Sequence, residues 1–151
     1  MIKGIKIIKL EKFNDQRGWL SEFFRNDEII DYAPAMGYVS QTLPGVSRGP
    51  HEHSSQSDFF VFIVGKFRLY LWDNRQGAKK YRILETFEVG GENPCSVLVP
   101  PGVVHAYRCI SKEPGLVINL PDSLYKGKGK LEEIDEIRWE DGRNSPFKIN
   151  D

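Results

Sequence analysis

The segment RGPHEHSSQSDFF, residues 48–60, decides how this sequence folds and what chemistry it can perform. Two histidines, His51 and His53, are one residue apart, and a carboxylate follows at Asp58 before a run of aromatic residues. Side chains two residues apart on a β-strand point to the same face of the sheet, so we expect the two imidazoles to project together. Asp58 joins them if the intervening Ser-Ser-Gln-Ser turns or bulges. Such a group can hold a metal ion or transfer protons, and the residues alone leave both open.

A second polar segment, VPPGVVHAY at residues 99–107, places His105 just after a Pro-Pro-Gly turn, where the chain re-enters a sheet. We expect His105 to meet the first two histidines inside a pocket. Elsewhere, apolar residues alternate with polar ones or run in short blocks, and turn residues separate these stretches. This pattern is typical of β-strands. The predicted strands are residues 5–10, 19–24, 39–43, 59–64, 67–72, 81–87, 96–99, 104–110 and 116–120, with a short helix at 26–32. Many short strands joined by Gly and Pro predict an antiparallel sandwich or closed barrel, with a jelly roll as the leading architecture.

Length and composition narrow the functional classes. A chain of 151 residues suits one domain with one core. Lys plus Arg and Asp plus Glu both total 21, so no basic field favours nucleic acid as a partner. The N-terminal MIKGIKIIKLEKF has no apolar run for a signal peptide or membrane helix. Cys95 and Cys109 lack CxxC spacing and are expected to be buried thiols, and a cytoplasmic location is the expectation.

We therefore expect a single domain over residues 1–151, with its core at about residues 38–121 and a polar tail at 122–151. The strands within residues 3–25 are expected to form a dimer or ligand-binding region. The strand at 67–72 carries apolar residues on both faces, which predicts cover by a second sheet or a partner subunit.

Two motifs resemble the signatures of the cupin superfamily. They are Gly45, five residues, His51-x-His53, four residues, Asp58, six residues, Gly65, and later Pro100-x-Gly102, two residues, His105. This resemblance implies an all-β cupin jelly-roll barrel. Asp58 stands where cupins commonly have Glu, and Cys109 stands where an Asn closes the second motif.

A narrower resemblance covers nearly the whole chain. Four ordered blocks look like those of dTDP-4-dehydrorhamnose 3,5-epimerases: DQRGWLSEFFR (15–25), SQTLPGVSRGPHEH (40–53), VGKFRLYLWDNR (64–75) and VPPGVVHAYRC (99–109). The HxH pair is more similar to the related 3,4-ketoisomerases. Together these resemblances imply an isomerase that needs no cofactor and acts, as a homodimer, on a nucleotide-linked 4-keto sugar in carbohydrate biosynthesis. Neither nucleic acid nor a membrane is an expected partner.

The resemblance also implies roles for individual residues. His51 matches the base that removes the proton beside the sugar ketone, and Arg48 with His105 would stabilise the enolate. A tyrosine would return the proton, for which the sequence offers Tyr107 and Tyr125. The positions expected to bind substrate are Arg17, Glu22 and Gln41 for the nucleotide, partly across a dimer interface, with His53 and Asp58 in the pocket.

Three positions depart from the family pattern. Asp58 stands where these epimerases have a pocket Lys, and Val117 or Ile118 stands where they have the proton-donating Tyr. The Asp that partners the base lies in a C-terminal segment that this chain is expected to lack. His51 is therefore expected to be oriented by Asp58 or Asp122.

Two alternatives stay open at the level of sequence. The first is a metal-dependent cupin enzyme, an oxygenase or metal isomerase, in which His51, His53, Asp58 and His105 hold one divalent transition metal. The second is a barrel that binds sugar nucleotides without turnover.

Overall fold

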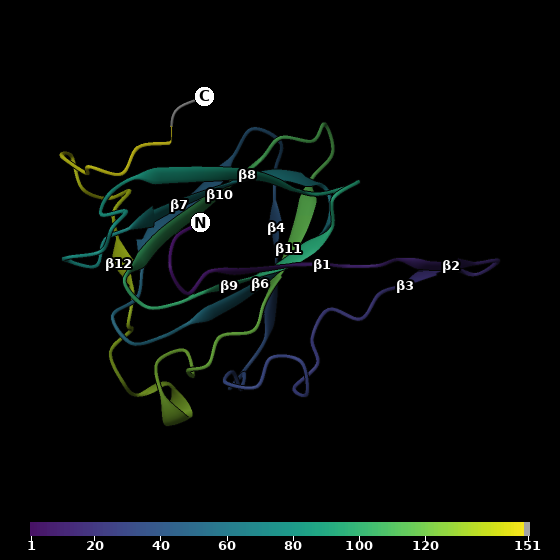
Figure 1. The fold of residues 1–151 in the computed structure, drawn as a ribbon, viewed down its shortest axis with the longest axis horizontal. Coiled ribbons are helices and arrows are strands. Elements are labelled where there is room, and N and C mark those ends of the chain that lie inside the picture. Colours follow the sequence, from purple (N-terminus) through teal and green to yellow (C-terminus); the bar gives the residue numbers. More distant parts are fainter. Residues whose placement is uncertain (150–151) are drawn as a thin grey trace.

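Two antiparallel sheets of five strands each form the body of the molecule (Figure 1). The structure is a computed structural model that describes residues 1–149; residues 150 and 151, the end of the predicted tail, lie outside the described part. The first sheet has the order β1 (Lys6–Lys9), β9 (Cys95–Val99), β6 (Asp58–Val64), β11 (Gly115–Asn119) and β4 (Tyr38–Thr42). The second has the order β12 (Ile137–Arg138), β5 (Ser47–Glu52), β10 (Val103–Cys109), β7 (Lys66–Asp73) and β8 (Leu84–Gly90). The predicted all-β architecture is confirmed.

The main core lies between the two sheets. It is built from alternate residues of the central strands, among them Phe60, Phe62, Phe67, Leu69 and Tyr107. Both cysteines are free and buried, as predicted. The tight connection at Gly65 brings β6 directly into β7: its φ is +83°, and a Cβ there would lie 2.5 Å from the Gly115 Cα. Only glycine fits this turn.

The outer face of the second sheet is buried under the end of the same chain. Tyr70 and Trp72 stack at 6.2 Å on this face, and Phe147 packs on Trp72 with ring centroids 5.7 Å apart. Trp139 meets Phe147 edge-on at 5.0 Å. The prediction of two buried faces is thus confirmed, but the cover is residues 135–149 of this chain, called here the C-terminal clasp.

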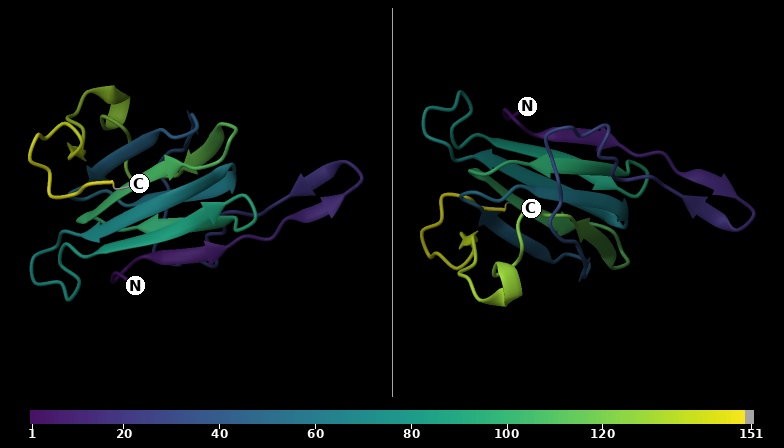
Figure 2. Two further views of the ribbon diagram at one scale, coloured as in Figure 1. Left: turned by 90° about the horizontal axis from the view of Figure 1, so that it is seen from above. Right: turned by 90° about the horizontal axis from the view of Figure 1, so that it is seen from below.

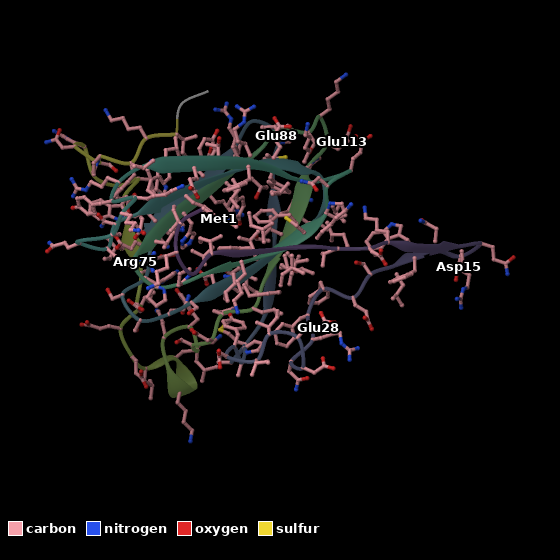
Figure 3. All side chains as sticks on the ribbon, in the orientation of Figure 1. Met1, Asp15, Glu28, Arg75, Glu88 and Glu113 are labelled. Atoms are coloured by element: carbon pink, nitrogen blue, oxygen red, sulfur yellow. The ribbon has the colours of Figure 1, made fainter. Side chains whose placement is uncertain are left out.

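A two-stranded hairpin, β2 (Phe13–Asp15) and β3 (Gly18–Leu20), projects away from the body (Figures 1 and 2). Asp15 marks its far end (Figure 3). Apolar side chains on this arm lie open to solvent, with Phe13 56%, Trp19 48% and Leu20 63% exposed. Such a concentration of exposed apolar surface is typical of an interaction site.

Three predicted element boundaries were wrong. The strand expected at 19–24 ends at Leu20, because its only hydrogen-bonded partner is the three-residue β2. The strand expected at 81–87 begins at Leu84. Residues 26–32 form turns instead of a helix. A segment this short gains too few backbone bonds to offset the cost of helix nucleation. Among residues 1–149, no helix is long and apolar enough to cross a membrane.

Candidate active site

Strands β5 and β10 bring the three histidines together inside the barrel. His105 lies directly opposite His51 in the register of these two strands, and His53 follows the end of β5. The rings of His53 and His105 stack with centroids 5.6 Å apart, and those of His51 and His105 meet edge-on at 6.3 Å. The convergence predicted from the i, i+2 spacing and the Pro-Pro-Gly turn is confirmed.

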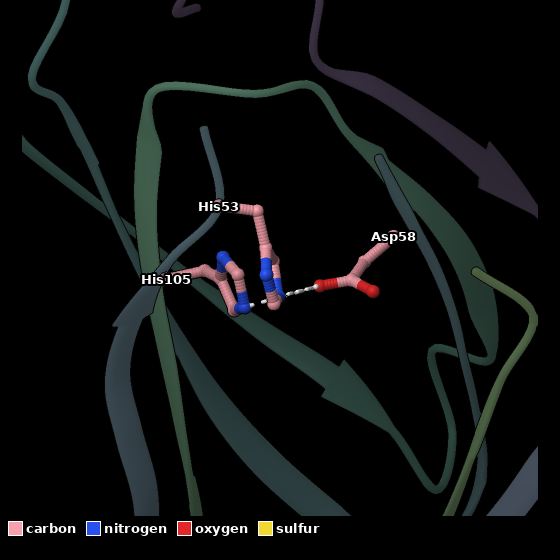
Figure 4. A group of neighbouring side chains, drawn as sticks. All are labelled: His53, Asp58 and His105. Atoms are coloured by element: carbon pink, nitrogen blue, oxygen red, sulfur yellow. Dashed lines mark ion pairs between the residues drawn. The ribbon is translucent and has the colours of Figure 1, made fainter. Parts of the chain in front are cut away.

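Asp58, at the start of β6, supplies the buried anion of this group and is 2% exposed. Its Oδ2 lies 3.0 Å from His53 Nε2 and 3.3 Å from His105 Nε2, so both rings address the same side of the carboxylate (Figure 4). Its Oδ1 accepts hydrogen bonds from Gln56 Nε2 at 3.0 Å and Asn119 Nδ2 at 2.8 Å. Side chains from four positions therefore enclose the carboxylate.

Charge in this group is divided unequally between the two rings. Burial opposes the protonation of His53, but the hydrogen bond and charge of Asp58 raise its pKa to about 9. Burial lowers the pKa of His105 to about 4. Although burial also opposes ionisation of Asp58, the hydrogen bond from His53 holds its pKa below the ordinary value. At neutral pH the group is thus an ion pair of His53 and Asp58 beside a neutral His105.

His51 has a different set of partners from the one predicted. Its Nε2 lies 2.5 Å from Glu140 Oε1 and its Nδ1 lies 3.6 Å from Glu136 Oε1. The expected partners are used elsewhere: Asp58 is bound by the other two histidines, and Asp122 accepts the backbone N–H of Ser57 at 2.9 Å. The partners predicted for this ring, Asp58 and Asp122, were therefore wrong: the carboxylates that it contacts are glutamates of the C-terminal segment.

The C-terminal clasp places these two glutamates through strand pairing. In β12, Arg138 lies opposite His51, so Glu136 and Glu140, two residues to either side, share the face of His51. Trp139 points to the other face, where its indole N–H donates to Glu52 at 2.8 Å. The alternation of charged and apolar residues at 136–140 was the signal available in the sequence.

Arg48 and Tyr107 link the two sheets near this group. Arg48 donates from Nε to Thr42 Oγ1 at 3.1 Å and from Nη2 to the Gln41 carbonyl at 2.8 Å. Tyr107 is 6% exposed, and its hydroxyl lies 3.3 Å from Ser40 Oγ. Both predicted residues belong to the same end of the barrel as the histidines.

Other predicted residues lie apart from the histidines. Tyr125 is half exposed in the loop after β11, where its backbone N–H contacts Met36. Arg17 pairs with Asp15 at the end of the arm, at 2.5 Å. Glu22 lies 3.7 Å from Arg25. On β4, the side chain of Gln41 faces the side opposite to its inward-facing neighbours.

Tyr38 is an inward-facing residue that the sequence prediction missed. It begins β4, and its hydroxyl accepts a hydrogen bond from Asn119 Nδ2 at 3.0 Å. Burial of the hydroxyl raises its pKa to about 12. The alternation of Tyr38 with Ser40 and Thr42 was the signal that would have found it.

Comparison with known proteins finds relatives named for polysaccharide and glycan biosynthesis. Relatives include the spore coat polysaccharide biosynthesis protein SpsL of Bacillus subtilis (strain 168), 32% identical over 141 residues that cover 93% of this chain and 92% of the relative. The probable low-salt glycan biosynthesis epimerase Agl13 of Haloferax volcanii is 36% identical over 126 residues, which cover 82% of this chain and 81% of the relative.

Among solved structures, a dTDP sugar isomerase from Desulfovibrio desulfuricans G20 superposes with a TM-score of 0.80 at 22% identity, covering 91% of this chain and 84% of that one. This likeness confirms the cupin jelly-roll fold. The model of the family described as dTDP-4-dehydrorhamnose 3,5-epimerase matches residues 1–144. The chain therefore belongs to the dTDP-4-dehydrorhamnose 3,5-epimerase family, whose members are enzymes acting on sugar nucleotides.

Proposed function

We propose that this protein is an epimerase or ketoisomerase of nucleotide-linked 4-keto sugars that works by proton abstraction without a cofactor. The observation that carries the proposal is the arrangement of His51, which is partly exposed inside the barrel end and held by a carboxylate from the C-terminal clasp. Family membership supports the substrate class.

The contacts of His51 define which nitrogen acts. Glu140 accepts a hydrogen bond from the Nε2–H of His51. In the neutral imidazole the lone pair is then on Nδ1. A C–H bond beside a ketone is weakly acidic, so Nδ1 removes its proton while nearby donors stabilise the enolate oxygen. Two carboxylates, Glu140 and Glu136, then flank the imidazolium and stabilise its charge.

Arg48 is the donor that we assign to the enolate oxygen, because its guanidinium is charged and exposed beside the histidines. His105 is buried and faces Asp58, so it supports the reaction through that carboxylate. A tyrosine returns the proton, and the sequence prediction of Tyr107 or Tyr125 remains a prediction. Return of the proton to the opposite face of the same carbon inverts that centre, whereas return at the neighbouring carbon moves the carbonyl.

The experiment is solvent exchange. The protein is incubated in D₂O with a panel of dTDP- and GDP-linked 4-keto sugars, and the reaction is monitored by NMR. We expect deuterium to enter beside the ketone of at least one of these sugars. Ligand-dependent thermal stabilisation with no exchange across the panel would instead identify a binding protein without turnover.

Replacing Glu140 by Gln is expected to lower kcat for exchange on the order of 10²-fold, because the ring loses the charge that stabilises its protonated form. KM should stay near the wild-type value, since Glu140 contacts the base and not the substrate in this proposal. Glu133→Gln, at an exposed position of the same tail, is the matched control. Equal losses in the two variants would contradict the role of Glu140.

We further propose that two copies of this single domain associate through the arm in a cytoplasmic homodimer. The exposed Trp19 and Leu20 support this, as does the position of β4 at an open edge of the first sheet. Arg17 and Glu22 would then bind nucleotide in the partner's barrel.

We expect Trp19→Ser to shift the mass measured by light scattering from dimer to monomer, because it removes apolar surface from the association site. Leu131→Ser, 88% exposed but away from the arm, is the control and should leave the mass unchanged. A wild-type protein that is monomeric at high concentration would refute the dimer.

One observation favours a metal-dependent enzyme as a second candidate. The side chains of His53, Asp58 and His105 place three ligand atoms within 4.8 Å of one another. The Nδ1 of His53 also faces the backbone carbonyl of Asp135, and the Nδ1 of His105 faces that of Val103. Metal-ligating histidines make the same kind of contact with their second ring nitrogen. Near-stoichiometric transition metal in untagged protein, lost in His53→Ala, would favour this candidate.

A further inference from the structure

We infer that Tyr38 is the catalytic acid that delivers a proton to the substrate from the wall of the barrel facing His51. This inference rests on the proposed function, which needs a donor opposite the base but leaves its identity open. It follows from the position of Tyr38, from the direction of its hydrogen bond, and from comparison with Tyr107 and Tyr125, the two tyrosines that the sequence analysis offered for this role.

Base and phenol stand on opposite sheets at the same end of the barrel. His51 is on β5 of the second sheet, and Tyr38 is on β4 of the first. Asp58 connects them: its Oδ2 lies 3.3 Å from Nε2 of His105, the residue opposite His51, and its Oδ1 accepts a hydrogen bond from Asn119, which also donates to the Tyr38 hydroxyl. A planar enolate held between these walls would present one face to each residue. Tyr38 as a whole residue is 47% exposed.

The hydrogen bonds around Asn119 fix which way the phenol proton points. The Oδ1 of Asn119 accepts the backbone N–H of Phe59 at 3.1 Å, so its amide nitrogen must face the other way. That nitrogen donates one hydrogen to Asp58 at 2.8 Å and the other to Tyr38 at 3.0 Å. The phenol oxygen is therefore an acceptor in this bond, and its own proton is not used there. After proton transfer, the same Asn119 N–H would stabilise the phenolate.

Neither Tyr107 nor Tyr125 combines these properties. Tyr107 is on the sheet of the base, its hydroxyl is engaged with Ser40, and its ring is enclosed edge-on by three Phe rings with only 6% of the residue exposed. Tyr125 lies in the loop after β11, with its ring 5.8 Å from the Lys126 ammonium. Tyr38 is the tyrosine that is both inward-facing and open.

The step balances without any further reactant. His51 takes the proton from the carbon beside the ketone, and the C–H electron pair becomes the C=C bond of the enolate while the carbonyl π pair moves to oxygen. The Tyr38 O–H bond then breaks, its proton bonds to the opposite face of the same carbon with the C=C pair, and the carbonyl re-forms. The phenolate regains a proton from water, and His51 releases its proton to water.

The test separates exchange from inversion. In D₂O, Tyr38→Phe should exchange the substrate C–H with retained configuration, because the base is intact, while inversion falls on the order of 10²-fold or more. Tyr81→Phe is the matched control, since it removes a phenol oxygen outside the site and should keep the wild-type ratio of inversion to exchange. Thermal melting of each variant checks that the fold is kept.

Each result decides one question. Inversion that survives in Tyr38→Phe, or that is lost with exchange intact in Tyr107→Phe or Tyr125→Phe, would overturn the assignment of Tyr38 alone. A wild-type protein that exchanges without inverting any centre would also overturn it. If the wild-type protein shows no exchange with any sugar in the panel, the proposed function fails and the assignment fails with it.

Discussion

Replacing His51 by Asn is expected to reduce deuterium exchange by about 10²- to 10⁴-fold, the range that a positioned proton-transfer group supplies. Asparagine removes the basic nitrogen, and the pairing of β12 with β5 is preserved because it is made by the backbone. The measurement is the rate of loss of the C–H signal in D₂O by NMR with the preferred sugar nucleotide.

The stability of His51→Asn provides the control. The C-terminal clasp is held independently by the indole bond of Trp139 to Glu52 and by the packing of Phe147 on Trp72. The melting midpoint should therefore stay close to that of the wild-type protein. Exchange at the wild-type rate in this variant would remove His51 as the base.

Raising the pH from 6.5 to 9 is expected to destabilise the chelator-treated protein by about 3 kcal/mol through His53 alone. The pKa of this ring is raised from 6.5 to about 9 in the fold, and each pKa unit is worth about 1.4 kcal/mol. A folded pKa above the unfolded value means that the stabilisation is complete below pH 6.5 and is lost as pH approaches 9. Urea unfolding at several pH values measures the slope.

Asp58→Asn is the variant that isolates this effect. Without the carboxylate, the buried His53 loses the anion that favours its charge, so the fall in stability between pH 6.5 and 9 should largely disappear. Burial raises the pKa of the Cys95 thiol from 9.0 to about 11, so that group affects the pH dependence only above pH 9. A slope equal to that of the wild-type protein would show that His53 and Asp58 are not an ion pair.

Sequence patterns predicted the fold and the histidine group because both depend on short-range rules. The period of two put His51 and His53 on one face, and the turn at Gly102 returned the chain so that His105 met them. The spacing within each motif is local, so it could be read directly.

The partners of His51 could not be read from the sequence in the same way. Glu140 reaches His51 through β12, a strand of two residues that pairs with β5 from far along the chain. The alternation at 136–140 is a local signal for a strand but does not name its partner, which depends on apolar packing of Trp139 against Phe147. Tyr38 was missed by one residue, because the strand predicted at 39–43 begins at 38.

The order of these elements along the chain has a consequence for protein synthesis. Every strand of the two sheets except β12 precedes the residues that hold His51, so a ribosome completes most of the barrel before it delivers Glu136 and Glu140. Until then, Tyr70 and Trp72 have no cover. In a newly made chain, His51 therefore gains its carboxylate partners and Trp72 gains its apolar cover in the same event, the docking of residues 135–149.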